Sequence, residues 1–145
     1  MKSWSLVLAL FLSCCALAQQ PSAVFSGTWT ASTGPNQFFH GTWSGESSPN
    51  RPNAARGSWA LFNESNQIVL QGTWSAQKTG QGWEGTWTAR PAGGQLLAGS
   101  WTADAAKLNA KTLSQMLTST VTKEVAGWWQ SGRNQGNWWL KGTGK

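Results

Sequence analysis

Apolar and polar residues alternate with a period of two over several short segments of the chain. Between residues 68 and 76, one face of an extended chain would carry apolar or small side chains, and the other mainly polar ones. The first face holds Ile68, Leu70, Gly72, Trp74 and Ala76, and the second holds Val69, Gln71, Thr73 and Ser75. Such alternation is typical of an antiparallel strand with one buried face.

A short motif, glycine followed two positions later by tryptophan, recurs along the chain. Successive regular copies begin 13 to 16 residues apart, a spacing that suits short strands joined by turns. Glycine and tryptophan then share one face of each strand, and the residue between them takes the other. The six regular copies and two degenerate ones, which together predict eight strands, are Gly27-Thr28-Trp29, Gly41-Thr42-Trp43, Gly57-Ser58-Trp59, Gly72-Thr73-Trp74, Gly85-Thr86-Trp87, Gly99-Ser100-Trp101, Gly127-Trp128-Trp129 and Gly136-Asn137-Trp138.

Reciprocal pairing of glycine with tryptophan would explain this repeat, because an indole laid across a neighbouring strand needs a gap there. The pairing also predicts where each hairpin turns, midway between the two paired residues. The pairs Trp29–Gly41, Trp43–Gly57, Trp59–Gly72, Trp74–Gly85, Trp87–Gly99 and Trp129–Gly136 all have midpoints among Gly, Pro, Asn and Ser, the residues that turns favour. We therefore predict that the eight repeated indoles form the core.

These elements predict an all-β fold, an eight-stranded antiparallel up-and-down barrel or a strongly curled meander. Gly–Trp opposition at every interface adds no net stagger, whereas barrel closure requires sheared strands. Either some pairs slip by two residues, or the sheet stays open and curls over a helix. We expect a closed or nearly closed barrel, formed by one domain over residues 19–145.

One helix is predicted at about 104–117, inserted between the sixth and seventh strands. Asp104 is a suitable N-cap for Ala105–Leu117. The β-branched run Thr118–Thr122 then favours a return to extended chain. One apolar stripe of the helix consists of Ala106, Ala110, Leu113 and Leu117.

The segment Gly27-Thr28-Trp29, which opens the first strand after a short lead, resembles the Gly-x-Trp signature of lipocalins and avidins. The resemblance implies an exported, calycin-type eight-stranded barrel that binds a small ligand. This chain departs from the pattern because the motif recurs on every strand and the helix precedes the last hairpin. Indoles that fill the barrel leave little room for a calyx, and no binding residue is carried over from either family.

The first 18 residues have the features of a secretory signal. Lys2 is followed by an apolar stretch, and Ala16-Leu17-Ala18 is a small-x-small cleavage site. Cleavage there predicts a secreted or periplasmic protein without cysteine, because Cys14 and Cys15 are both removed. Lipid attachment at Cys14 is the alternative. Without Lys2, ten Lys and Arg face five Asp and Glu, and such a basic exported protein meets anionic envelopes and acidic polysaccharides.

Few residues are available for catalysis or metal binding. His40 is the single histidine and lies on the polar face of the second strand, whereas a zinc site normally takes three or four protein ligands. Glu46 and Glu84 lie on different strands, and their spacing does not support the paired carboxylates of a glycosidase. We therefore predict a non-enzyme without metal or cofactor.

Two tryptophans have the opposite parity from the repeated core positions. Trp128 and Trp139 would project outward from the last hairpin as near diagonal neighbours, with Gln130 and Lys141 on the same side. Indoles flanked by an amide and a cation suit stacking on a sugar or an aromatic ligand. Alternatively, the predicted helix packs over these two indoles, because the apolar face of a helix needs an apolar surface to pack against.

Two kinds of function remain open from the sequence. The first is a non-catalytic exported binding module, with a glycan or a small apolar molecule as ligand. The second is a structural, surface-association scaffold of the cell envelope, or an eight-stranded outer-membrane barrel. Scattered basic residues and export disfavour nucleic acid as a partner, and a polar helix between two strands disfavours membrane insertion. Oligomeric state is not predicted.

Overall fold

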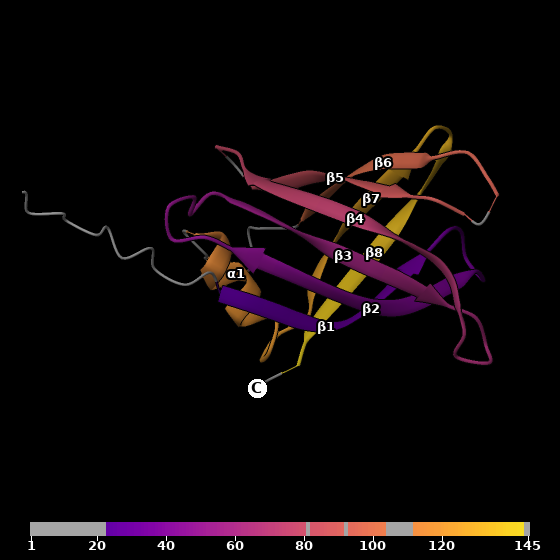
Figure 1. Ribbon diagram of the computed structural model, residues 1–145, viewed down its shortest axis with the longest axis horizontal. Coiled ribbons are helices and arrows are strands. Elements are labelled where there is room, and N and C mark those ends of the chain that lie inside the picture. The colour runs from indigo at the N-terminus through magenta and orange to yellow at the C-terminus, as the bar shows by residue number, and fades with distance from the viewer. Residues whose placement is uncertain (1–22, 81, 92, 104–111, 144–145) are drawn as a thin grey trace, which may run out of the picture.

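Eight antiparallel strands pair in chain order and close into a barrel, with the last strand joined to the first. The computed structural model describes residues 23–80, 82–91, 93–103 and 112–143, so the predicted signal segment lies outside the described residues. The strands are β1 (Ala23–Ser32), β2 (Phe38–Ser47), β3 (Ala54–Phe62), β4 (Ile68–Lys78), β5 (Trp83–Ala89), β6 (Leu97–Ala103), β7 (Val125–Ser131) and β8 (Asn134–Gly142). The helix α1 (Leu113–Ser119) lies between β6 and β7 and at one end of the barrel (Figure 1).

Reciprocal Gly–Trp pairing holds within four hairpins, β1–β2, β3–β4, β5–β6 and β7–β8. In β1–β2, for example, Trp29 lies opposite Gly41 and Gly27 lies opposite Trp43. The corresponding pairs are present in the other three hairpins. Each of the four turns contains a residue with positive φ, at Gly34, Asn66, Gly93 and Gly132, which such tight reversals favour.

The predicted pairs Trp43–Gly57 and Trp74–Gly85 are wrong, because the strands slip there by two residues. Trp43 lies opposite Trp59, and Trp74 lies opposite Trp87. In a reciprocal pair, the indole of the second strand lies two residues further along the barrel axis than the indole of the first strand. If the next interface were also reciprocal, the third indole would move back by the same two residues, because neighbouring strands run in opposite directions. Direct Trp–Trp opposition at the alternate interfaces avoids that reversal. The stagger therefore accumulates in one direction, as closure requires.

The repeated indoles fill the barrel in two interleaved series. Indoles of the odd-numbered strands contact one another edge to face at 5.8–6.5 Å between ring centroids, in the order Trp29, Trp59, Trp87, Trp129. Indoles of the even-numbered strands do the same at 5.6–6.5 Å, in the order Trp43, Trp74, Trp101, Trp138. Each contact skips one strand, which is the geometry that a glycine on the intervening strand makes available.

Hydrogen bonds show how far each indole reaches. The Nε1 of Trp29 passes over Gly41 of β2 and donates to the carbonyl of Ala60 on β3 at 3.1 Å. The Nε1 of Trp43 leans the other way, over Gly27 of β1, and donates to the carbonyl of Lys141 on β8 at 3.1 Å. The two series thus lean in opposite directions and tie non-adjacent strands together.

The helix closes the barrel end from which β1, β3, β5 and β7 start. Leu113, Met116 and Leu117 are buried in one cluster with inward residues of six strands, which a helix on the outer wall could not contact together. Small side chains at Ala55, Ala76 and Ala103 belong to the same cluster and leave room for the helix. The buried Trp83 packs there too and was missed in the repeat, although it shares the parity of Trp87.

The helix α1 follows the N-cap Thr112 and ends at Ser119, two residues later than predicted. The predicted start at Asp104 lies outside the described residues. The predicted extended run 118–122 is wrong, because residues 118 and 119 are helical and the next three form a turn. Hydroxyls there bond backward, with Thr120 Oγ1 donating to the carbonyl of Leu117 at 2.6 Å. Local side-chain bonds of this kind outweigh the β propensity.

Removing the helix cap tests how much α1 contributes. Thr112 and Gln115 form a capping box, and we expect Thr112→Ala to lower the free energy of unfolding by about 1 kcal/mol. Thr118→Ala, at an exposed helix position, is the matched control and should change it by less than about 0.5 kcal/mol. Urea denaturation followed by circular dichroism measures both, and equal effects would contradict the capping role.

Candidate functional site

The outer face of the barrel changes character at β7 and β8. On β1–β6 the middle residue of each repeat points outward and carries a hydroxyl, at Thr28, Thr42, Ser58, Thr73, Thr86 and Ser100. On β7 the corresponding residue is Trp128, and on β8 it is Asn137. The hairpin therefore interrupts an otherwise uniform band of small hydroxyl side chains.

The two outward indoles are diagonal neighbours, as predicted. Trp128 lies opposite Asn137, and Trp139 lies opposite Ala126. Residues so related are about 7–8 Å apart across a sheet. The Trp128 side chain is 60% exposed, and Trp139 is partly buried. The inward Trp138 donates from Nε1 to the Trp128 carbonyl at 3.1 Å, which anchors the backbone beneath the exposed ring.

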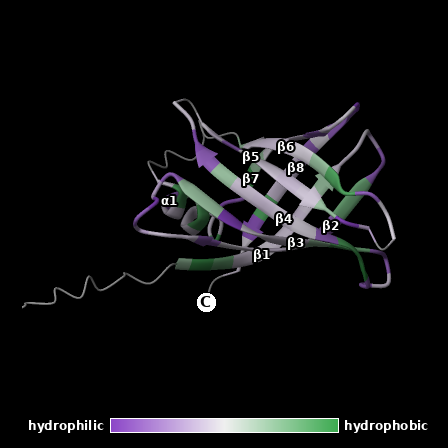
Figure 2. Cartoon of the chain, turned by 45° about the horizontal axis from the view of Figure 1, so that its top comes forward, coloured by the Kyte–Doolittle hydropathy of each residue, from purple (hydrophilic) through white to green (hydrophobic). Residues whose placement is uncertain are grey.

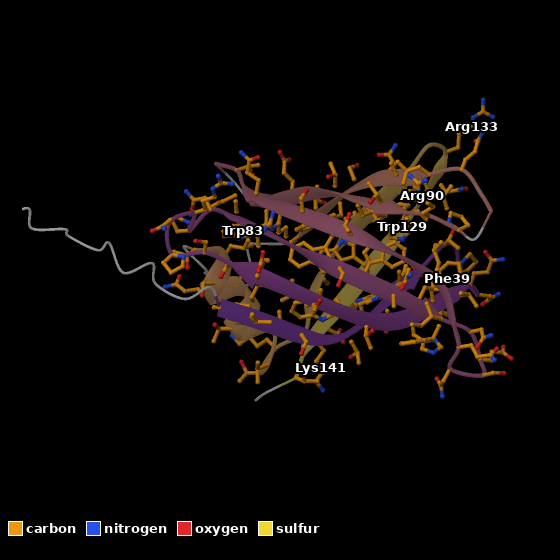
Figure 3. The ribbon with its side chains drawn as sticks, viewed as in Figure 1. Phe39, Trp83, Arg90, Trp129, Arg133 and Lys141 are labelled. Carbon is orange, nitrogen blue, oxygen red and sulfur yellow. The ribbon has the colours of Figure 1, made fainter. Side chains whose placement is uncertain are left out.

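The four predicted site residues share this face and form an ordered strip. Gln130 is two positions from Trp128 on β7, and Lys141 is two positions from Trp139 on β8. The order along the hairpin is therefore amide, indole, indole, ammonium, over about 20 Å at the usual rise per residue. The Lys141 side chain points away from the barrel (Figure 3). We call Trp128, Gln130, Trp139 and Lys141 the aromatic strip.

The alternative in which the helix covers these indoles is wrong for Trp128. The buried side chains of α1 pack on inward-facing residues at the barrel end, and Trp128 stays 60% exposed. The physical reason is that the open end of the barrel offers the helix a ring of small and apolar residues. The strip is thus available to a ligand.

Other candidate groups do not assemble into a reactive centre. His40 lies on β2 and packs against the ring of Phe62, with centroids 6.3 Å apart. Glu46 forms an ion pair with Arg56 at 2.9 Å. Within residues 23–80, 82–91, 93–103 and 112–143, no three His, Cys, Asp or Glu side chains cluster as metal ligands would. Those same ranges contain no helix long and apolar enough to cross a membrane.

Exposed apolar side chains gather at the barrel end away from α1, a feature that the sequence pattern only partly indicated. β2 and β6 become hydrophobic toward that end (Figure 2). Phe38 is exposed there, and Ile68, predicted to face inward, is exposed too. A shift in register at Leu61/Phe62 places Ile68 opposite Phe62. We call Phe38, Ile68, Val69, Leu96 and Leu97 the apolar rim.

Comparison with known proteins adds no family assignment. The chain matches no protein-family model, no curated protein and no solved structure.

Proposed function

We propose that this chain is a non-catalytic, exported binding module that holds a glycan on the aromatic strip. The observation that carries the proposal is the outward pair of Trp128, which is 60% exposed, and Trp139, which is partly buried. They stand on a barrel whose repeated indoles face inward. Indole faces stack on the apolar faces of sugar rings, while the Gln130 amide and the Lys141 ammonium supply hydrogen bonds to hydroxyls. Residues 1–18 would direct secretion or periplasmic export.

An outer-surface ligand agrees better with the packing than a ligand inside the barrel. In the calyx that the lipocalin and avidin resemblance implies, the ligand would occupy the interior. Here two series of indoles in mutual contact occupy it instead. The polar hydroxyl band on the outer face of β1–β6 also favours a binding module over an outer-membrane barrel, which presents an apolar band outward.

Alanine substitutions of the two outward indoles test the proposal. We expect Trp128→Ala and Trp139→Ala each to lower the affinity of the Gln19–Lys145 chain at least tenfold for the glycans that it binds through the strip on a glycan array, because truncating an aromatic anchor removes most of the stacking contact. Trp128→Ala should leave the melting temperature within a few degrees of the parent chain. Phe38→Ala removes a similarly exposed aromatic ring outside the strip and should leave glycan binding unchanged. A large stability loss with unchanged binding would refute the site.

The apolar rim favours one second candidate, a surface-association scaffold of the cell envelope. Its five side chains are exposed at the strand ends opposite α1, and exposed apolar patches commonly mark association surfaces. Under this alternative, Phe38→Ala together with Ile68→Ser would release the protein from the envelope fraction of the cell, whereas Trp128→Ala would not. The opposite pattern would support the glycan-binding module.

A further inference from the structure

A shallow trough, lined by outward hydroxyl side chains among apolar atoms, crosses the outer face of β1–β5. It consists of two adjoining depressions with volumes of about 570 and 860 Å³. Both depressions are lined by Ser44, Ser58 and Thr73, so they form one continuous surface. We call this surface the hydroxyl trough, because outward Ser and Thr side chains of five neighbouring strands line it.

The trough results from side-chain size on the strands. The middle residues of the repeats have small hydroxyl side chains, so the outer surface is depressed midway along the strands. Longer side chains border this depression, with Glu46 and Arg56 on one side and Gln71 and Arg90 on the other. Five strands at about 4.8 Å spacing give the trough a length of about 19 Å, which suits an extended chain lying across the strands.

Cross-strand hydrogen bonds hold the hydroxyls of the trough in place. Ser44 pairs with Ser58, and Thr73 pairs with Thr88, each at 2.9 Å between side-chain oxygens. A hydroxyl has one donor hydrogen and two acceptor lone pairs, so each pair uses one hydrogen and leaves the second available. The trough therefore offers rows of positioned groups that both donate and accept, which match the hydroxyls of a sugar chain.

Charge indicates the kind of sugar chain. Glu46 and Arg56 neutralise each other at 2.9 Å at one boundary of the trough, Arg90 is the one charged side chain among the described residues at the other boundary, and the hydroxyls between the boundaries are uncharged. An acidic polysaccharide would find no row of cations along this floor, whereas a neutral one needs none. The chemistry thus favours a neutral, polyhydroxylated ligand.

We propose that the hydroxyl trough binds a neutral linear polysaccharide. The trough is centred on β3, and the aromatic strip lies on β7 and β8. In the closed barrel β8 pairs with β1, and Lys141 of the strip lies opposite Thr28 of the trough, so the two surfaces adjoin at this edge. The trough proposal does not rest on the proposed function.

The experiment separates the two sites by substitution. The triple variant Ser44→Ala, Ser58→Ala, Thr73→Val removes the three hydroxyls that both depressions share, and it retains side-chain size within one atom and β propensity. Affinity electrophoresis through gels containing a β-1,4-glucan, a β-1,3-glucan, a xylan or a mannan measures binding. The parent chain, the triple variant, the double variant Trp128→Ala Trp139→Ala and the combination of all five changes are compared.

We expect the double variant to keep measurable affinity for at least one of these neutral glycans, and the triple change to lower that affinity at least tenfold. Thr102→Val, an outer-face change on β6 outside the trough, should have no effect in the same background. Loss of all retardation in the double variant would overturn the trough and leave the aromatic strip as the site. Loss in the triple variant alone would overturn the strip and support the trough.

Discussion

Gly41→Ala is expected to lower the free energy of unfolding by about 3 kcal/mol, the upper end of ordinary overpacking. A Cβ at this position would collide with the backbone carbonyl of Ala60 and lie 2.8 Å from Nε1 of Trp29. Neither neighbour can yield easily, because the carbonyl belongs to the adjacent strand and the indole is held by its hydrogen bond to that same oxygen. Urea denaturation followed by tryptophan fluorescence measures the loss.

Gly80→Ala is the matched control for this change. Gly80 lies in the β4–β5 turn, where an added Cβ would meet nothing within 4 Å. If the cost of glycine substitution came only from backbone entropy, both variants would change stability by similar, small amounts. Equal stability of the two variants would show that the glycines are not notches for indoles, and the packing account of the barrel would fail.

Local pattern was sufficient to predict the strands and four of the six Gly–Trp pairs. Gly–Trp opposition could be deduced for Trp29 and Gly41 from their spacing and from the turn residues midway between them. The slip that sets Trp43 opposite Trp59 could not be deduced that way. It satisfies the stagger of a closed barrel, a property of all eight strands together, and the local repeat is compatible with either register.

The helix was predicted in outline but its docking was not. Its stripe residues Leu113 and Leu117 are buried as expected, but their partners come from six strands far apart in sequence. Periodicity shows that an apolar face exists and not which surface covers it. For the same reason, the sequence left two alternatives for Trp128, exposed or covered by the helix. Strand parity predicted its outward direction correctly, and the position of α1 shows that it is exposed.

The candidate site was therefore more predictable than the packing around it. Strand parity has a strict period of two, so an indole at the wrong parity in a regular repeat is a local signal that survives errors in long-range register. The hydroxyl trough was not predicted, although the middle Ser and Thr residues of the repeats were assigned to the face opposite the indoles. Its shape depends on the size difference between the middle and the ends of neighbouring strands, which becomes evident only when their registers are known.

The second large effect is expected for Trp74→Ala, which should lower the free energy of unfolding by about 3–5 kcal/mol. Trp74 contacts both Trp43 and Trp101 edge to face, donates from Nε1 to the carbonyl of Ser44 at 3.0 Å, and covers Gly57. Its removal leaves a cavity between Trp43 and Trp101 and uncovers the glycine beneath it. Both neighbouring indoles then lose the ring contact that Trp74 provides.

Trp128→Ala is the control, because the same residue type is truncated on the outer face, where it is 60% exposed. We expect it to change the free energy of unfolding by no more than about 0.5 kcal/mol, against several times that for Trp74→Ala in the same urea titration. Near-ultraviolet circular dichroism gives a second readout, since the ordered edge-to-face series should lose intensity when Trp74 is removed and not when Trp128 is. Comparable losses from both variants would mean that the inward and outward indoles contribute alike, which is incompatible with a barrel held together by its interior series.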